Sequence, residues 1–322
     1  DLDVITRSAE IINTGKEMVW LRKASSMCLE LPYGNWDMVH FHGRHCMERQ
    51  AERIKLFHGV HTLISGRGMS SHQHNPFVII CDHEATEDSG ACYGMMLMYS
   101  GNHAEEIEVD QAGSTRLVSG IHPEGFSWLL PAGETFETPE AILSFSAEGL
   151  NGLSRHYHDI LRQQVIPSRW QQAERPVLIN SWEACYFNFT GELLFELAMQ
   201  AKENGGEMLV MDDGWFSDRD DDRHALGDWF VNEEKLPGGL APLIERVNAE
   251  GLKFGIWYEP EMISPDSELF RAHPDWCVHV AGREPMLGRH QYVLDVSRAD
   301  VRDNIWQQMY AVLSSNKIDY IK

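Results

Sequence analysis

The sequence lacks a surplus of positive charge, a long apolar run and any close pairing of its cysteines. Its 27 Lys and Arg stand against 49 Asp and Glu, a formal net charge of −22, which argues against nucleic-acid binding because that affinity depends on clustered basic residues. Its apolar runs fall short of the roughly 20 residues that a membrane-spanning helix needs, and its six cysteines form no Cys-x-x-Cys motif. The opening DLDVITRSAE has no signal-peptide pattern. We therefore expect a cytoplasmic protein without nucleic-acid or membrane partners.

The first half of the chain has the pattern of short β-strands. Runs such as NPFVIICDH, YGMMLMYSG and STRLVSGI are bounded mostly by Gly, Asn, Asp or Pro, and strands at this spacing predict a sandwich of antiparallel sheets. Residues 148–162, EGLNGLSRHYHDILR, switch to helical spacing, and a linker with two prolines, VIPSRWQQAERP, follows. We therefore predict a β-sandwich domain at 1–165, whose N-terminal part is expected to be missing, and a second domain at 166–322.

Apolar runs alternate with helical patterns in the second half. The runs are PVLINSW, EMLVMDDGW, KFGIWYEPE, QYVLDVS and IDYIK, and helical stretches cover 191–204, 241–250 and 299–315. This alternation is typical of a parallel sheet buried on both faces, either open and doubly wound or closed as a (β/α)8 barrel. No GxGxxG or GxxxxGK(S/T) motif follows a run, so a nucleotide-binding open sheet is not favoured. Polar and aromatic residues at the ends of the runs favour the barrel, whose sites lie at those ends.

The predicted fold class is therefore a β-sandwich followed by α/β, namely an antiparallel β-supersandwich and then the first five strands of a (β/α)8 TIM barrel. The chain stops at Lys322, directly after an apolar run, and a parallel sheet edge left there would expose unpaired backbone groups. We expect a fragment of a longer protein, from which roughly three strand–helix units of the barrel are absent.

Residues at the ends of these runs form the candidate binding site. Two carboxylates follow the second run, tryptophans end the first and third, and basic residues precede the fourth and end the fifth. The set is Trp182, Asp212, Asp213, Trp257, Arg289 and Lys322. Aromatic faces pack on the C–H groups of sugars, and charged groups hydrogen-bond to hydroxyls. The set therefore predicts a polyhydroxylated ligand.

Each of these residues also has a simpler structural interpretation. Asp-Asp-Gly after a strand can cap a helix or shape a turn, either tryptophan can belong to the core, and the two basic residues can be surface charges. We favour a binding site because all the runs bring polar groups to the same rim.

The acidic segment SDRDDD at 217–222 raises the question of a calcium site. Asp218, Asp220 and Asp222 have the spacing of an EF-hand loop, but Arg223 stands where glycine is needed and Trp229 where glutamate is needed. We therefore predict a solvated loop that follows the second strand.

The histidines at 40, 42, 45, 72 and 74 could ligate a metal, but no acidic ligand lies at an obvious spacing nearby. We therefore expect no metal site. A serine nucleophile is not indicated either, because the sequence has no GxSxG motif.

Several motifs together resemble the α-galactosidases of glycoside hydrolase family 36. They are RPVLINSWEA, LVMDDGWF, LGDWFVNEEKLPGGL, LKFGIWYEPEMISPDSELFRAHPDW, YVLDVSR and IDYIK, with SSHQHNPF, TEDSGACYGMMLMYSGN and EGLNGLSRHYH in the first half. The order DDGWF, WxEPE and IDYIK is specific to that family, and the sequence is most similar to its large bacterial enzymes that cleave melibiose and raffinose. The resemblance implies a homotetramer that hydrolyses galactose-containing oligosaccharides with retention of configuration and without a cofactor.

The resemblance also implies a role for each candidate residue. Asp212 and Asp213 would bind the 4- and 6-hydroxyls of galactose, Trp182 and Trp257 would line the pocket, and the two basic residues would contact sugar hydroxyls. In the family the nucleophile is an Asp two residues beyond the position of Lys322, and the acid/base Asp lies further on. No catalytic residue is therefore expected within the chain itself.

Other functions stay open from the sequence. One is a relative of raffinose or stachyose synthase, and another is an α-N-acetylgalactosaminidase. A non-catalytic galactose-binding protein with a degenerate barrel belongs to a different class, as does a metal-dependent barrel enzyme.

Overall fold

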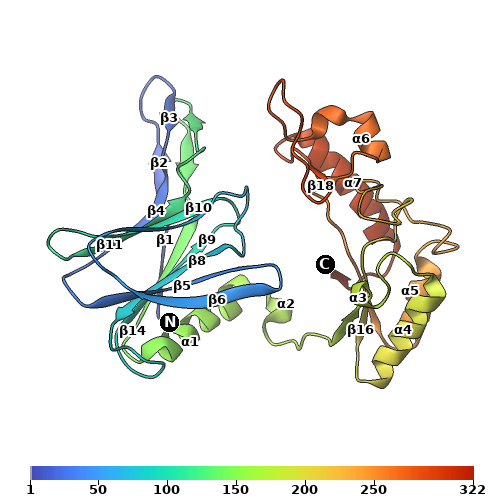
Figure 1. The fold of residues 1–322 in the computed structure, drawn as a ribbon, viewed down its shortest axis with the longest axis horizontal. Coiled ribbons are helices and arrows are strands. Elements are labelled where there is room, and N and C mark those ends of the chain that lie inside the picture. The colour runs from blue at the N-terminus through green and yellow to red at the C-terminus, as the bar shows by residue number, and fades with distance from the viewer. Residues whose placement is uncertain (1) are drawn as a thin grey trace. The chain divides into compact units, whose positions relative to one another are not determined.

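A computed structural model describes residues 2–322 (Figure 1). The chain divides into two compact units, Asp1–Ala173 and Glu174–Lys322. The division lies within the two-proline segment VIPSRWQQAERP, whose short helix α2 (Ser168–Gln171) stays with the first unit. None of the helices in residues 2–322 has the length and apolarity that crossing a bilayer requires.

Two antiparallel sheets dominate the first unit. Within residues 2–322, the larger has the order β1 (Val4–Arg7), β14 (Glu140–Ser146), β9 (Cys92–Met98), β8 (His74–Asp82), β5 (Trp36–Arg44) and β6 (Met47–Lys55). The smaller has the order β4 (Ser25–Leu31), β11 (Thr115–Ile121), β10 (His103–Val109) and β7 (Gly59–Ser65). Two further antiparallel pairs join strands that are distant in the chain, β12 (Trp128–Leu130) with β3 (Val19–Leu21) and β13 (Thr135–Glu137) with β2 (Glu10–Ile12).

Side chains from both large sheets form one hydrophobic cluster. Met38 and Ile80 enter it from the larger sheet, and Ile107 and Leu117 from the smaller. All four side chains are at most 2% exposed. Apolar residues at alternate positions of each strand point to the same face, so the imperfect alternation in the sequence is sufficient to build a core between the sheets.

Helix α1 (Gly149–Ile160) packs against β14 and β9 (Figure 1). It buries Leu153 and Tyr157, and the Tyr157 hydroxyl donates a 3.0 Å hydrogen bond to the carbonyl of Ile142. The contact is close because Gly94 on β9 has no side chain: a Cβ there would lie 2.6 Å from the Tyr157 ring. A π-helical turn, Leu161–Val165, follows α1.

A parallel sheet organises the second unit. Among residues 2–322 its order is β15 (Leu178–Asn180), β16 (Met208–Met211), β17 (Lys253–Ile256) and β20 (Tyr320–Ile321). Helices α4 (Gly191–Glu203), α5 (Ala241–Ala249) and α7 (Ala299–Ser315) alternate with these strands, and α3 (Trp182–Cys185) directly follows β15. The three long helices were predicted within one residue of these bounds. Every residue of β16 is buried, as expected for a strand covered on both faces.

The prediction that QYVLDVS forms a strand of this sheet is wrong. Residues Tyr292–Val293 form β19, which pairs antiparallel with β18 (Met262–Ile263). Together with α6 (Glu268–Ala272) and the 3-10 turn Pro274–Trp276, they surround a separate small cluster. A short apolar run can be buried in either setting, and periodicity alone does not distinguish them. In the described part of the chain, the parallel sheet therefore has four strands rather than five.

We predict that Leu209→Ala destabilises the second unit strongly, because Leu209 on β16 is 0% exposed within the main core of that unit. Truncation of a buried leucine leaves a cavity and costs about 2–5 kcal/mol of unfolding free energy. Leu193→Ala on α4, where the side chain is 42% exposed, is the matched control and should change stability by no more than about 0.5 kcal/mol. Urea denaturation followed by tryptophan fluorescence measures both, and equal effects would contradict this packing.

Candidate functional site

The candidate site lies at the carboxyl ends of the parallel strands. Asn180 ends β15, Asp212 follows β16, Trp257 follows β17 and Lys322 follows β20. Parallel strands bring their carboxyl ends to one edge of a sheet, which is where α/β proteins place their ligands. Residues as far apart as 180 and 322 therefore meet there.

Asp212 is the centre of a tight hydrogen-bond cluster. Its Oδ2 accepts bonds of 2.6 Å from Lys322 Nζ and of 2.6 Å from Asn180 Nδ2. Its backbone N–H donates to the hydroxyl of Ser181 at 3.0 Å, and its Oδ1 accepts from the backbone N–H of Asp213 at 2.9 Å. The carboxylate is thus fixed by groups at the ends of three strands. Asp212 is also buried, with only 4% of its surface exposed.

Asp213 is held by a different cation. Arg219 donates from Nε to Oδ1 at 3.0 Å and from Nη2 to Oδ2 at 2.9 Å. Burial raises the pKa of Asp213, and the two bonds from Arg219 oppose that rise. Such a fork adds both energy and a fixed geometry to a single charge-assisted hydrogen bond.

The segment 217–222 after β16 is exposed at Asp218, Asp220 and Asp222, as the sequence predicted for a solvated loop, but Arg219 departs from that prediction. Arg219 is completely buried, and Lys235 fixes the loop from a later segment by donating to the carbonyls of Gly214 at 2.9 Å and Arg219 at 3.0 Å. Lys235 also pairs with Asp220 at 2.7 Å. Sequence reasoning treated Arg219 as one charge in an acidic surface run; the only available signal was its isolation among aspartates directly after DDGW.

The two tryptophans are partly buried and contact other aromatic rings. Trp182 meets Tyr186 and Phe187 edge to face at 5.1 and 5.0 Å, and its backbone N–H donates to Asn180 Oδ1 at 2.8 Å. Trp257 stacks on Phe216 at 6.5 Å and packs on the main core. Each tryptophan is therefore fixed by packing on one side and retains an exposed portion.

Arg289 is the least constrained of the predicted residues. Its side chain is 74% exposed and lies 3.6 Å from Glu259 Oε1, so in the described structure it is placed beside Glu259 rather than bonded to either aspartate. Glu259 also accepts a long 3.4 Å bond from Gln291. Burial raises the pKa of Glu259, and the positive charge of Arg289 opposes that rise. The structure therefore places five of the six candidates at the strand ends and Arg289 on an adjacent loop.

This arrangement offers hydrogen-bond acceptors and donors in one place. The carboxylates of Asp212 and Asp213 can accept hydrogen bonds from ligand hydroxyls, and Lys322 and Asn180 can donate hydrogen bonds to ligand hydroxyls. Charge-assisted bonds of this kind are stronger than neutral ones. Together with the tryptophan faces, they suit a ligand that has many hydroxyl groups and apolar C–H faces.

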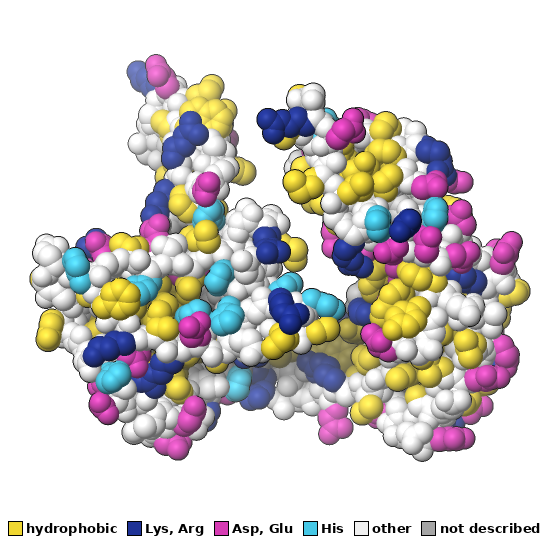
Figure 2. Space-filling model, in the orientation of Figure 1, with side chains coloured by type: hydrophobic (Ala, Val, Ile, Leu, Met, Phe, Trp, Pro, Cys, Tyr) yellow, Lys and Arg dark blue, Asp and Glu magenta, His cyan; other side chains and the backbone are white. Residues whose placement is uncertain are grey.

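The part of the chain that the structure describes contains no cluster of side chains that could hold a metal ion. Figure 2 shows histidine side chains gathered on the visible face of the first unit. Within residues 2–322, however, no three His, Cys, Asp or Glu side chains are placed together as metal ligands.

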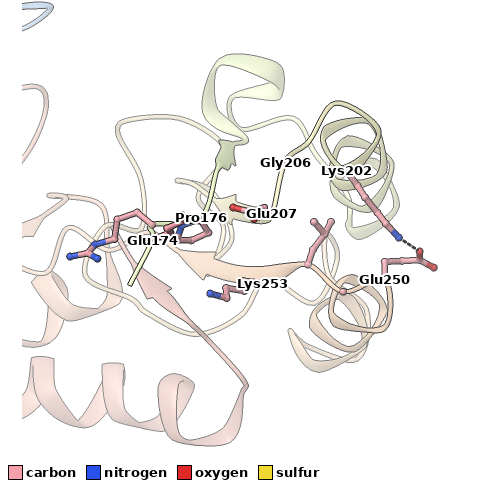
Figure 3. A pocket seen from close by; sticks show the side chains of 10 residues that line it. Glu174, Pro176, Lys202, Gly206, Glu207, Glu250 and Lys253 are labelled. Atoms are coloured by element: carbon pink, nitrogen blue, oxygen red, sulfur yellow. Dashed lines mark hydrogen bonds and ion pairs between the residues drawn. The ribbon is translucent and has the colours of Figure 1, made fainter. Parts of the chain in front are cut away.

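A separate pocket of about 360 Å³ lies at the opposite end of the strands in the second unit (Figure 3). Pro176 and Glu207 precede β15 and β16, and Lys253 begins β17, so the pocket is at their amino-terminal ends. It contains the 2.8 Å ion pair between Lys202 and Glu250 and none of the predicted binding residues. Its position is typical of a structural face rather than a ligand site.

Comparison with known families assigns both halves of the chain. The family described as Melibiase matches residues 135–322, and the Glycosyl hydrolase family 36 N-terminal domain matches residues 1–131. The chain therefore belongs to glycoside hydrolase family 36, as the motifs had indicated.

Its similar relatives are α-galactosidases. The chain is 52% identical to the bifunctional alpha-galactosidase/sucrose kinase AgaSK of Mediterraneibacter gnavus, covering 99% of the chain and 34% of the relative. It is 49% identical to alpha-galactosidase AgaA of Geobacillus stearothermophilus, covering 99% and 44%. The crystal structure of AgaA matches with a TM-score of 0.97 at 48% identity, over 99% of this chain and 45% of that one. The chain thus spans less than half the length of these relatives.

We predict that Arg289→Gln raises the pKa of Glu259 further. The substitution removes the positive charge that opposes the effect of burial on this carboxyl. Arg283→Gln, an exposed arginine in the same segment, is the control and should leave the titration unchanged. Carbon-13 NMR titration of glutamate-labelled protein measures the pKa, and an unchanged or lower value in Arg289→Gln would show that the pair does not form.

Proposed function

We propose that this chain is the sugar-binding part of a retaining α-galactosidase that hydrolyses terminal α-D-galactosyl residues of melibiose- and raffinose-type oligosaccharides. The relatives in this family carry that activity in their names. Variants of AgaA were solved in complex with raffinose and with stachyose. The observation that carries the proposal is the pair of buried carboxylates, Asp212 and Asp213, each held by its own cation at the strand ends.

In this proposal each candidate residue has a defined role. Asp212 and Asp213 accept hydrogen bonds from the 4- and 6-hydroxyls of galactose, and Trp182 and Trp257 line the pocket. Lys322 and Arg289 contact further hydroxyls. Glucose carries its 4-hydroxyl in the other orientation, so it would leave a buried carboxylate without that partner, and sites of this kind discriminate strongly.

The reaction proceeds by double displacement between two further carboxylates. One attacks the anomeric carbon while the other protonates the leaving oxygen, and the two lie about 5–5.5 Å apart in retaining enzymes. We assign neither role to a residue of this chain and propose, from the family resemblance, that both follow Lys322 in the whole protein. The chemistry needs no cofactor, because the carboxylates supply the nucleophile and the proton.

The architecture that fits this function is a β-supersandwich at 1–165 followed by the beginning of a (β/α)8 barrel at 166–322. The hydrophobic cluster shared by the two antiparallel sheets supports the first part. The parallel order β15-β16-β17-β20 with intervening helices supports the second. A homotetramer and a cytoplasmic location remain predictions from the resemblance and the sequence.

We predict that Asp212→Ala in the whole protein lowers kcat/KM for p-nitrophenyl α-galactoside by at least about 10³-fold, because it removes a charged acceptor and leaves Lys322 unpaired. The wild type should release nitrophenol from the α-anomer and not from the β-anomer. Asp222→Ala, an exposed aspartate of the following loop, is the matched control and should retain wild-type rates.

Near-wild-type hydrolysis by Asp212→Ala would overturn the assignment of the carboxylate pair. A wild-type protein that binds galactose and releases no nitrophenol would instead favour a binding protein over an enzyme.

A further inference from the structure

Arg219 has no exposed surface, and its guanidinium meets Asp213 edge to edge. Each carboxylate oxygen has two lone-pair directions. The fork occupies one direction on each oxygen, and the backbone N–H of Gly214 also donates to this carboxylate, so the direction that remains can accept from a ligand. The plane of the carboxylate is then set by the plane of the guanidinium and not by the ligand.

Arg219 is itself fixed on its remaining sides. Its Nη1 donates to the carbonyl of His224 at 2.8 Å, and its guanidinium carbon lies 5.6 Å from the centre of the Phe187 ring. Lys235 holds the backbone of the same loop by donating to the carbonyls of Gly214 and Arg219. The orientation of Asp213 therefore depends on Arg219, and Arg219 is in turn held by His224, Phe187 and the backbone that Lys235 fixes.

Other charges near Asp213 do not replace Arg219. Asp212 is a like charge and raises the pKa of Asp213, and the backbone N–H of Gly214 lowers it less than Arg219 does. Lys322 is bonded to Asp212, and Glu259 adds further negative charge on this side. Arg219 is thus the cation that compensates Asp213.

We propose that Arg219 is a positioning residue for sugar recognition: it compensates the buried charge of Asp213 and fixes the plane in which the carboxylate accepts hydrogen bonds from sugar hydroxyls. The inference rests on the proposed function and adds to it a residue that acts through Asp213 and does not itself contact the substrate. Recognition at this site then depends on a buried arginine in the loop after β16 as well as on the residues that line the pocket.

The test compares Arg219→Gln with Arg223→Gln in the whole protein. Arg223 is in the same loop and is exposed, so it controls for loss of a loop arginine. We expect Arg219→Gln to lower kcat/KM for p-nitrophenyl α-galactoside by at least about tenfold at neutral pH, mainly through KM. Arg219→Lys keeps the charge and loses the fork, so it should restore only part of the activity.

The pH profile separates positioning from a merely structural role. Without Arg219, the pKa of Asp213 rises further, so the carboxyl is protonated at higher pH and accepts fewer hydroxyl bonds. The acidic limb of kcat/KM should therefore move to higher pH in Arg219→Gln and stay in place in Arg223→Gln. An acidic limb that does not move in an active Arg219→Gln variant would overturn the inference. Failure of the proposed function would appear differently, as a wild type without α-galactosidase activity.

A stability measurement covers the case in which Arg219→Gln folds but is too unstable for the activity assay. The double variant Asp213→Asn with Arg219→Gln removes both buried charges, so its thermal midpoint should be well above that of Arg219→Gln. This recovery would show that the arginine is needed because Asp213 is charged. A double variant as unstable as the single one would assign Arg219 to packing alone and would contradict the inference.

Discussion

Two adjacent carboxylates are buried at the end of one strand, and the rest of the site follows from the need to compensate them. Asp212 and Asp213 are 4% and 6% exposed, and two neighbouring negative charges withdrawn from water are unstable unless each is paired. Arg219 comes from six residues away, whereas Lys322 comes from 110 residues away on the next strand but one. One charge is thus compensated locally and the other only when the parallel sheet has formed.

The fold was predictable where local pattern and tertiary setting agree. The fully buried run at β16 and the three long helices of the second unit follow directly from continuous apolar residues and helical spacing. The run QYVLDVS satisfied the same pattern and was assigned to the parallel sheet incorrectly, because its strand pairs with β18 and its Tyr292 and Leu294 face a satellite cluster that includes Trp276. Periodicity reports that a residue is buried, and it does not report against which element.

The candidate site was predictable to the extent that strand ends converge. Asp212, Trp257 and Lys322 could be grouped from sequence because parallel strands deliver their ends to one edge, and the structure joins Asp212 to Lys322 directly. Arg219 could not be found in this way, since a buried arginine and a surface arginine look the same in a sequence of charged residues. Only the three-dimensional closure of the loop over Asp213 shows that its charge is needed inside.

The central claim is that this carboxylate pair recognises galactose, and a crystal structure of the whole protein with bound galactose tests it most directly. The account predicts sugar hydroxyl oxygens about 2.5–2.7 Å from oxygens of both Asp212 and Asp213, as charge-assisted O–H···O bonds require, with the Arg219 fork still in place. Galactose bound elsewhere, with both aspartates contacting only their present partners, would contradict it.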